Sequence, residues 1–128
     1  MPSSPTVFIV DDDLAALSSA NHLLSSVDFA VEAFDSAESF LAAFAPHKWG
    51  CLLVDVRMPG MTGRQLQQVL KQDEIDMPVI LISGYADGVL SDDATADGAF
   101  AVLEKPVDAE ELIATIQEAI KTSAQNRA

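Results

Sequence analysis

The sequence predicts an α/β fold in which a parallel, doubly wound sheet is covered by helices on both faces. Five short apolar runs alternate with stretches in which apolar residues recur at helical spacing. One run, Cys51-Leu52-Leu53-Val54, is apolar at every position, as expected for a strand buried on both faces. The chain of 128 residues has the length of a single domain, and no repeat is visible in it.

The predicted strands are rich in β-branched and aromatic residues and are bounded by charged or turn-forming ones. In chain order they are Val7–Val10, Phe29–Phe34, Cys51–Val54, Pro78–Ile82 and Ala99–Leu103. Crossovers between parallel strands are right-handed, so the intervening helices cover both faces. In such a sheet a functional site lies beyond the carboxyl ends of the strands, where the strand order reverses.

Four helices are predicted from apolar residues at a period of about 3.6 and from residues that favour helix ends. Their predicted caps or first residues are Asp13, Ser36, Thr62 or Gly63, and Asp108. Pro46 ends the second helix, because proline cannot continue one. We expect residues 1–5 to be a disordered N-terminus, 6–122 to form the domain, and 123–128 to be a frayed tail or linker.

Composition and charge exclude several function classes. The formal net charge is −13, which repels nucleic acid and favours a cationic or metal partner. The single cysteine, Cys51, cannot form an internal disulfide, which suits a reducing compartment. Neither a signal peptide nor an apolar run of membrane-spanning length is visible, so we expect a cytoplasmic location and no membrane partner.

Polar residues follow four of the five predicted strands. Asp11, Asp12 and Asp13 follow the first strand and Asp55 follows the third, whereas the fourth and fifth strands lead to Ser83 and Lys105. The carboxyl ends of parallel strands meet at one edge, so these residues converge there. Carboxylates about 5 Å apart repel by roughly 3 kcal/mol per pair at an effective dielectric of about 20.

A hard divalent cation would offset this repulsion, and Mg²⁺ (or Mn²⁺) suits a site of few oxygen ligands. Such an ion is typically shared with a phosphate, which makes Asp55 the natural nucleophile for an aspartyl-phosphate. Ser83 could hydrogen-bond one phosphoryl oxygen, and Lys105 could pair with another. Asp13 is instead predicted to be a helix cap.

Together with Met58-Pro59-Gly60 after the central aspartate, this set resembles the receiver domain of two-component response regulators, from about Thr6 to Thr122. The stretches Ser36–Leu41 and Arg57–Gly63 resemble the subfamily that regulates nitrogen fixation and usually carries a LuxR-type output domain. The resemblance implies a flavodoxin-like (βα)5 sheet of order 2-1-3-4-5.

The resemblance also implies roles. Asp55 accepts phosphate from a sensor histidine kinase or a small acyl-phosphate donor, and the domain catalyses only its own phosphorylation and dephosphorylation. Asp11, Asp12, Asp55 and the backbone carbonyl of Arg57 hold the metal, while Ser83 and Lys105 contact the phosphoryl group. The Lys105–Pro106 bond is expected to be cis. The domain is expected to be a monomer or a weak phosphorylation-dependent dimer that controls an output domain.

Two departures from the family pattern concern its switch region, for which we single out Val102, Tyr85 and Pro106. Val102 occupies a position that is usually aromatic, and valine is too small and too stiff at χ1 to swing between two sites. The segment 87–98, in the place of the fourth helix, has four aspartates and a glycine near each end. It is predicted to be a short, displaced or mobile helix.

Three other functions compete with a switching receiver. A phosphatase of the haloacid dehalogenase type places a second acid two residues after its nucleophile, where this chain has Arg57. A flavodoxin-like cofactor binder needs a phosphate-binding loop after the first strand, where Asp11–Asp13 would repel phosphate unless a metal intervened. A receiver-shaped interaction module that no longer switches is kept open by Val102 and the weak fourth helix.

Overall fold

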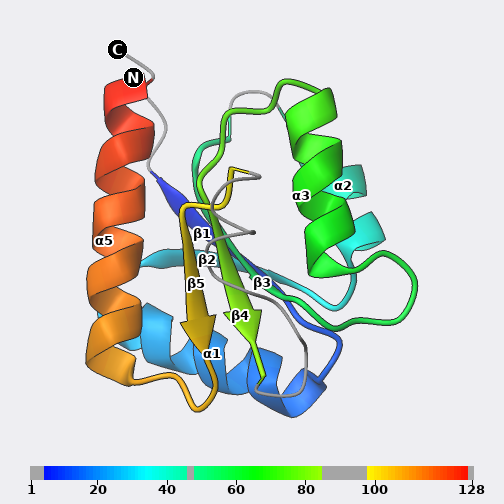
Figure 1. The fold of residues 1–128 in the computed structure, drawn as a ribbon. Helices are drawn as coiled ribbons and strands as arrows, with labels where there is room; N and C mark the ends of the chain where they lie inside the picture. The colour runs from blue at the N-terminus through cyan, green and yellow to red at the C-terminus, as the bar shows by residue number, and fades with distance from the viewer. Residues whose placement is uncertain (1–4, 46–47, 85–97, 127–128) are drawn as a thin grey trace.

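In the computed structural model, which describes residues 5–45, 48–84 and 98–126, five parallel strands form one sheet in the order β2-β1-β3-β4-β5 (Figure 1). The strands are β1 (Thr6–Val10), β2 (Ala30–Phe34), β3 (Gly50–Asp55), β4 (Val79–Ser83) and β5 (Ala101–Glu104). The predicted fold class and strand order are confirmed, since β1 and β3 are neighbours and the chain winds outward from them in both directions.

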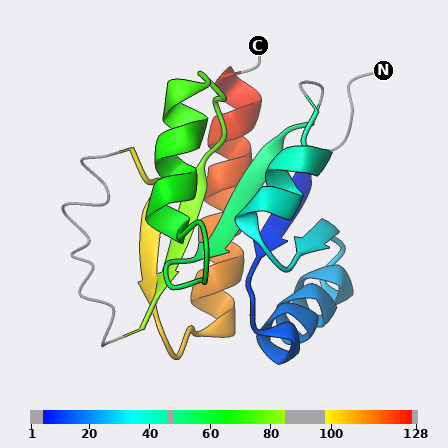
Figure 2. The ribbon, with the colours of Figure 1, turned by 90° about the vertical axis from the view of Figure 1, so that its right-hand side faces the viewer.

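Helices cover both faces of this sheet. They are α1 (Leu14–Ser26), α2 (Ala37–Ala43), α3 (Gly63–Gln72) and α5 (Ala109–Asn126). The two ribbon views place α1 and α5 on one face and α2 and α3 on the other (Figures 1 and 2). Over the part of the chain that the structure describes, no helix is long and apolar enough to span a lipid bilayer.

The predicted caps of the helices are present. Asp13 Oδ1 accepts hydrogen bonds from the backbone N–H groups of Ala15 and Ala16 at 3.0 and 3.3 Å. Thr62 and Gln65 form a reciprocal capping box at the start of α3. These bonds satisfy backbone donors that have no partner within a helix, and they fix where each helix leaves the sheet edge.

The end of α5 differs from the prediction of a frayed tail that starts at Ser123. The helix continues to Asn126, and Ser123 is only 2% exposed. The polar composition of this stretch suggested a solvated end, but the periodicity of α5 places Ser123 on its buried side, in register with Ile116 and Ala119. Packing against the domain therefore extends the helix beyond its apolar residues.

The sheet divides the apolar core into two clusters. The cluster under α2 and α3 contains Phe8, Phe40 and Leu66, and its phenylalanines meet edge to face, with 5.6 Å between the ring centroids of Phe8 and Phe40. The cluster under α1 and α5 contains Leu24 and Ile116. All six residues of β3 are buried between the two clusters, which confirms that this strand is covered on both faces.

Cys51 gives a measurable consequence of this burial. Its side chain is inaccessible to solvent, and burial raises the pKa of the thiol from 9.0 to about 12. Above pH 9 the unfolded chain releases a proton that the folded chain keeps, so the free energy of unfolding falls as pH rises toward 12. Between pH 8 and pH 10 we expect this residue to lower the free energy of unfolding by roughly 1 kcal/mol.

Urea unfolding of the wild type and of Cys51→Ala at both pH values measures this contribution. The alanine variant carries the same lysines and tyrosine, so the difference between the two pH dependences isolates the thiol. Parallel pH dependences would contradict the raised pKa.

Candidate functional site

The carboxyl ends of the strands bring the predicted site residues to one edge of the sheet. Asp55 is the last residue of β3 and Ser83 the last of β4, while Asp11 and Lys105 directly follow β1 and β5. Backbone bonds continue the sheet past the strand ends: the Lys105 N–H donates to the Ser83 carbonyl at 2.8 Å, and the Asp11 N–H donates to the Phe34 carbonyl at 3.1 Å. The sheet itself therefore holds these residues in register.

Both carboxylate oxygens of Asp55 are hydrogen-bonded. Lys105 Nζ donates to Oδ2 at 2.7 Å, and the backbone N–H of Arg57 donates to Oδ1 at 3.0 Å. The Asp55 side chain is 7% exposed, whereas that of Lys105 is 46% exposed. The pair thus joins a buried anion to a cation that reaches in from solvent, and it fixes the direction of the carboxylate.

The acids after β1 lie beside this pair. Burial raises the pKa of the Asp11 carboxyl above its ordinary value, and the charges of Asp55 and Asp12 raise it further. The Asp13 N–H, which donates to Asp11 Oδ1 at 2.9 Å, and the charge of Lys105 act in the opposite direction. The predicted repulsion of Asp11 by its acidic neighbours is therefore present, although burial contributes more to the raised pKa.

These side chains line an open pocket of about 460 Å³, whose lining residues are Asp11, Asp12, Asp13, Asp55, Arg57, Met58, Pro59, Gly84 and Lys105. Within residues 5–45, 48–84 and 98–126, no three Asp, Glu, His or Cys side chains are close enough to bind a metal by themselves. The donor set fits Mg²⁺, which is commonly held by one or two carboxylates, a few further oxygens and several waters. It does not fit a metal that needs a closed cage of side chains.

Ser83 is buried, and its Oγ donates to the carbonyl of Gly84 at 3.2 Å. Its predicted contact with a phosphoryl group on Asp55 stays a prediction.

The switch region is described only in part. The Lys105–Pro106 bond is cis, as predicted. Val102 is half-buried and packs against the apolar cluster under α2 and α3. Tyr85 and residues 87–97 of the predicted weak helix lie outside the described residues, so these predictions stand as they were.

Two features of the site were missed by sequence reasoning. The backbone N–H of Arg57 donates to Asp55 Oδ1, whereas sequence reasoning assigned a role only to the carbonyl of this residue. Gly63 was predicted only as a helix start, yet it packs against the backbone of Asp55. No pattern in the sequence indicates this approach, because it depends on how closely α3 packs on the sheet.

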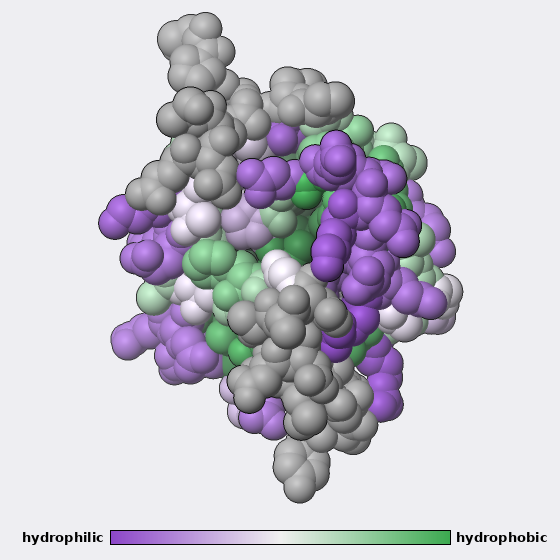
Figure 3. Space-filling view, turned by 45° about the horizontal axis from the view of Figure 1, so that its top comes forward, coloured by the Kyte–Doolittle hydropathy of each residue, from purple (hydrophilic) through white to green (hydrophobic). Residues whose placement is uncertain are grey.

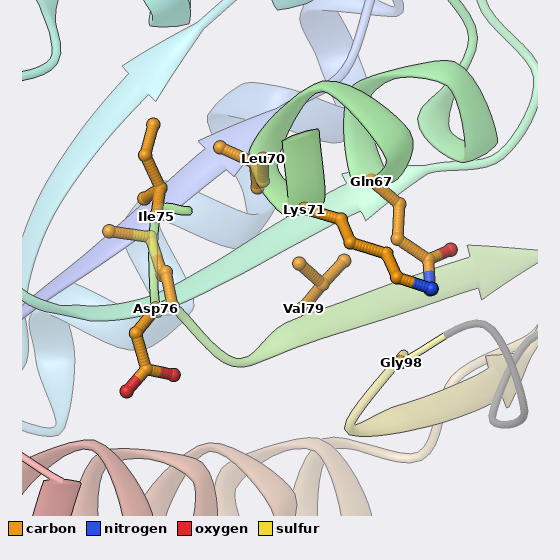
Figure 4. A pocket seen from close by; sticks show the side chains of 8 residues that line it. Gln67, Leu70, Lys71, Ile75, Asp76, Val79 and Gly98 are labelled. Carbon is orange, nitrogen blue, oxygen red and sulfur yellow. The ribbon is translucent and has the colours of Figure 1, made fainter. Parts of the chain in front are cut away.

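A second hollow, of about 250 Å³, lies near the amino ends of β4 and β5 (Figure 4). Residues at the end of α3, among them Leu70 and Lys71, form one wall, and Ile75, Val79 and Gly98 form others. Figure 3 looks toward this end of the molecule and shows apolar surface gathered between hydrophilic regions. The lining of this hollow has one lysine and one aspartate and lies away from the carboxyl ends of the strands, so it is not the candidate site.

Comparison with known proteins agrees with this geometry. Residues 7–117 match the model of the response regulator receiver domain. The chain is 37% identical over 94% of its length to the transcriptional regulatory protein FixJ of Bradyrhizobium diazoefficiens, and covers 59% of that protein. It is 39% identical over 94% of its length to the response regulator protein TodT of Pseudomonas putida, and covers 53% of it. The chain thus spans little more than half the length of these relatives.

Solved structures show the same likeness. The response regulator StyR superposes with a TM-score of 0.92 at 37% identity, over 98% of this chain and 63% of that one. FixJ-N superposes with a TM-score of 0.84 at 38% identity, over 93% of this chain and 95% of that one. The FixJ matches confirm the predicted subfamily resemblance. The chain belongs to the family of response regulator receiver domains.

Proposed function

We propose that this domain accepts a phosphoryl group on Asp55 from a sensor histidine kinase and thereby controls an output partner. The observation that carries the proposal is the buried Asp55 carboxylate, which lies at the end of β3 with Lys105 Nζ at 2.7 Å and opens onto an acidic pocket. The Asp55 side chain is held by hydrogen bonds to both of its oxygens and is only 7% exposed. An incoming phosphoryl group therefore meets a fixed nucleophile.

In the proposed reaction, a carboxylate oxygen of Asp55 attacks phosphorus and forms the new O–P bond. The bond from phosphorus to the donor breaks in line with it, and its electron pair stays on the leaving imidazole nitrogen or acyl oxygen. Lys105 then pairs with a phosphoryl oxygen, because its half-exposed ammonium can follow the negative charge from the carboxylate. Water then hydrolyses the acyl phosphate, which releases inorganic phosphate and restores the Asp55 carboxylate.

Mg²⁺ is the proposed cofactor, and Asp11, Asp12, Asp55 and the carbonyl of Arg57 would hold it. When bound, the ion neutralises charge between the carboxylates and the phosphoryl oxygens. Without an ion, the negative charges of these carboxylates would repel the phosphoryl oxygens.

The net charge of the chain bears on which partners we propose. A chain of net charge −13 is not expected to bind nucleic acid through this domain, so any transcriptional output would come from a separate domain or protein. This agrees with the greater length of the FixJ and TodT relatives. We propose a monomer or a weak phosphorylation-dependent dimer.

Incubation with acetyl phosphate and Mg²⁺ tests the proposed function directly. We expect one phosphoryl group per chain, and mass spectrometry of the borohydride-reduced protein should place it on Asp55. Modification at another residue, or none under conditions that keep an acyl phosphate intact, would refute the proposal.

The cofactor gives a separate prediction. Mg²⁺ should raise the melting temperature by an amount that grows with the logarithm of its concentration above the dissociation constant. Asp12→Asn should weaken Mg²⁺ binding by about tenfold or more, because a carboxylate ligand is lost. Calorimetric titration of both proteins measures this, with Asp28→Asn, an exposed acid in the turn after α1, as the control. Equal affinities for wild type and Asp12→Asn would contradict the ligand assignment.

A further inference from the structure

We propose that Gly63 is a positioning residue for the phosphoacceptor: its missing side chain lets α3 begin directly on the backbone of Asp55. The inference rests on the proposed function, because it concerns the same carboxylate. A Cβ atom at Gly63 would lie 2.6 Å from the Asp55 carbonyl oxygen and 3.0 Å from the Val56 Cα. Both are backbone atoms of the central strand or its continuation, so they cannot rotate away as the end of a side chain would.

The segment between Asp55 and Gly63 is fastened at both ends. At its start, the Val56 N–H donates to the Ile82 carbonyl of β4 at 2.9 Å. At its end, the Gly63 N–H donates back to the Val56 carbonyl at 3.1 Å. The segment is thus a closed loop whose two ends meet at Val56.

Two further contacts keep this loop in place. The Met58 side chain is only 5% exposed and belongs to the apolar cluster under α2 and α3. Thr62 is bound to Gln65 in the capping box at the start of α3. Because the loop is held in these ways, a displacement of α3 at Gly63 would move the peptide of Asp55, and a change in the shape of the loop would not compensate for it.

The requirement at Gly63 is one of space and not of backbone conformation. Gly63 is the first residue of a regular helix, whereas Gly60 and Gly98 have φ angles of +73° and +106°, which side chains rarely adopt. At Gly98 an added Cβ would meet nothing within 4 Å. Alanine at Gly63 would act by pushing on Asp55, and alanine at Gly98 would act only through backbone strain.

The peptide that Gly63 touches leads directly to the groups that orient the acceptor. The Arg57 N–H, two residues after Asp55, donates to Asp55 Oδ1, and Lys105 Nζ donates to Oδ2. A shift of the Asp55 backbone by a few tenths of an ångström changes both bonds together. Small misplacements of this kind can reduce reactivity by about 10²-fold when they reach about 1 Å.

Beryllofluoride, which mimics a phosphoryl group on a carboxylate, tests the proposal in the presence of Mg²⁺. We expect Gly63→Ala to weaken its binding, followed by ¹⁹F NMR, and to slow phosphorylation by acetyl phosphate, each by about tenfold or more. Two variants serve as controls at a temperature where all proteins are folded. Leu70→Ala leaves a cavity late in the same helix, at a residue 2% exposed, and Gly98→Ala strains the backbone elsewhere.

Both controls should bind beryllofluoride as the wild type does, even where they lower the melting temperature as much as Gly63→Ala. Wild-type affinity in Gly63→Ala would overturn the proposal, and so would an equal loss in Leu70→Ala, because the effect would then be one of stability. Failure of the wild type itself to bind would instead refute the proposed function.

If Gly63→Ala does not fold, amide hydrogen exchange of the wild type tests whether Gly63 is a positioning residue. A positioning contact requires the Gly63 N–H to be protected as strongly as the amides of β3, with and without beryllofluoride. Exchange of Gly63 at rates typical of a fraying helix end would overturn the proposal.

Discussion

Replacing Asp55 with asparagine should abolish phosphorylation of the domain, by at least about a thousandfold with acetyl phosphate or a histidine kinase as donor. The amide nitrogen and oxygen of asparagine are not nucleophiles at neutral pH, and no carboxylate occupies the same position at the end of β3. The fold should persist, because asparagine has nearly the volume of aspartate and its oxygen can still accept the Arg57 N–H. Intact-protein mass spectrometry measures the incorporated phosphoryl group.

Asp13→Asn is the matched control for this variant. It removes one negative charge from the same pocket, but asparagine preserves the N-cap that Asp13 provides for α1. We expect it to be phosphorylated at close to the wild-type level. Phosphorylation of Asp55→Asn at a comparable rate would show that another residue is the acceptor.

The second large effect is expected for Lys105→Met, which keeps most of the aliphatic side chain and removes the ammonium. Because that group contacts Asp55 Oδ2 at 2.7 Å, its loss should slow phosphoryl transfer by about a hundredfold or more. The change in unfolding free energy should stay within about 1 kcal/mol, since the Lys105 side chain is 46% exposed and solvent screens the pair. Rates of modification by acetyl phosphate and urea unfolding measure the two quantities.

A variant of a second lysine, Lys48, is the control that distinguishes the specific role of Lys105 from the general effect of losing an ion pair. Lys48 Nζ pairs with Glu32 Oε1 at 2.9 Å, and Lys48 precedes β3, at the opposite end of that strand from Asp55. Lys48→Met should alter stability by a similar small amount and leave the rate of phosphorylation unchanged. If both variants were slowed equally, Lys105 would have no specific role at the acceptor.

The sequence predicted the fold and the location of the site because both depend on simple patterns. Apolar runs alternating with helical stretches define the sheet, and its parallel topology brings the polar residues after each run to one edge. Asp55 and Lys105 are 50 positions apart, yet their contact follows from where β3 and β5 end. Helix starts were equally predictable, since Asp13 and Thr62 are favoured caps for local reasons.

Features that depend on packing were not predictable in this way. The extension of α5 past Ser123 reflects burial on the domain, and the orientation of Ser83 Oγ reflects a choice among rotamers. The close approach of Gly63 to Asp55 depends on the angle at which α3 meets the sheet. Each of these is set by three-dimensional contacts that a single sequence does not display.

The position of β3 in the middle of the sheet also affects how this protein would respond to heat. β1 and β4 pair with β3 on its two sides, and apolar side chains cover it above and below. Thermal fraying that begins at the outer strands or at chain ends would reach the acceptor last. We expect loosening of the outer strand β2 to leave the domain competent for phosphorylation, whereas loosening of the other outer strand, β5, would displace Lys105 and slow phosphorylation before the whole domain melts.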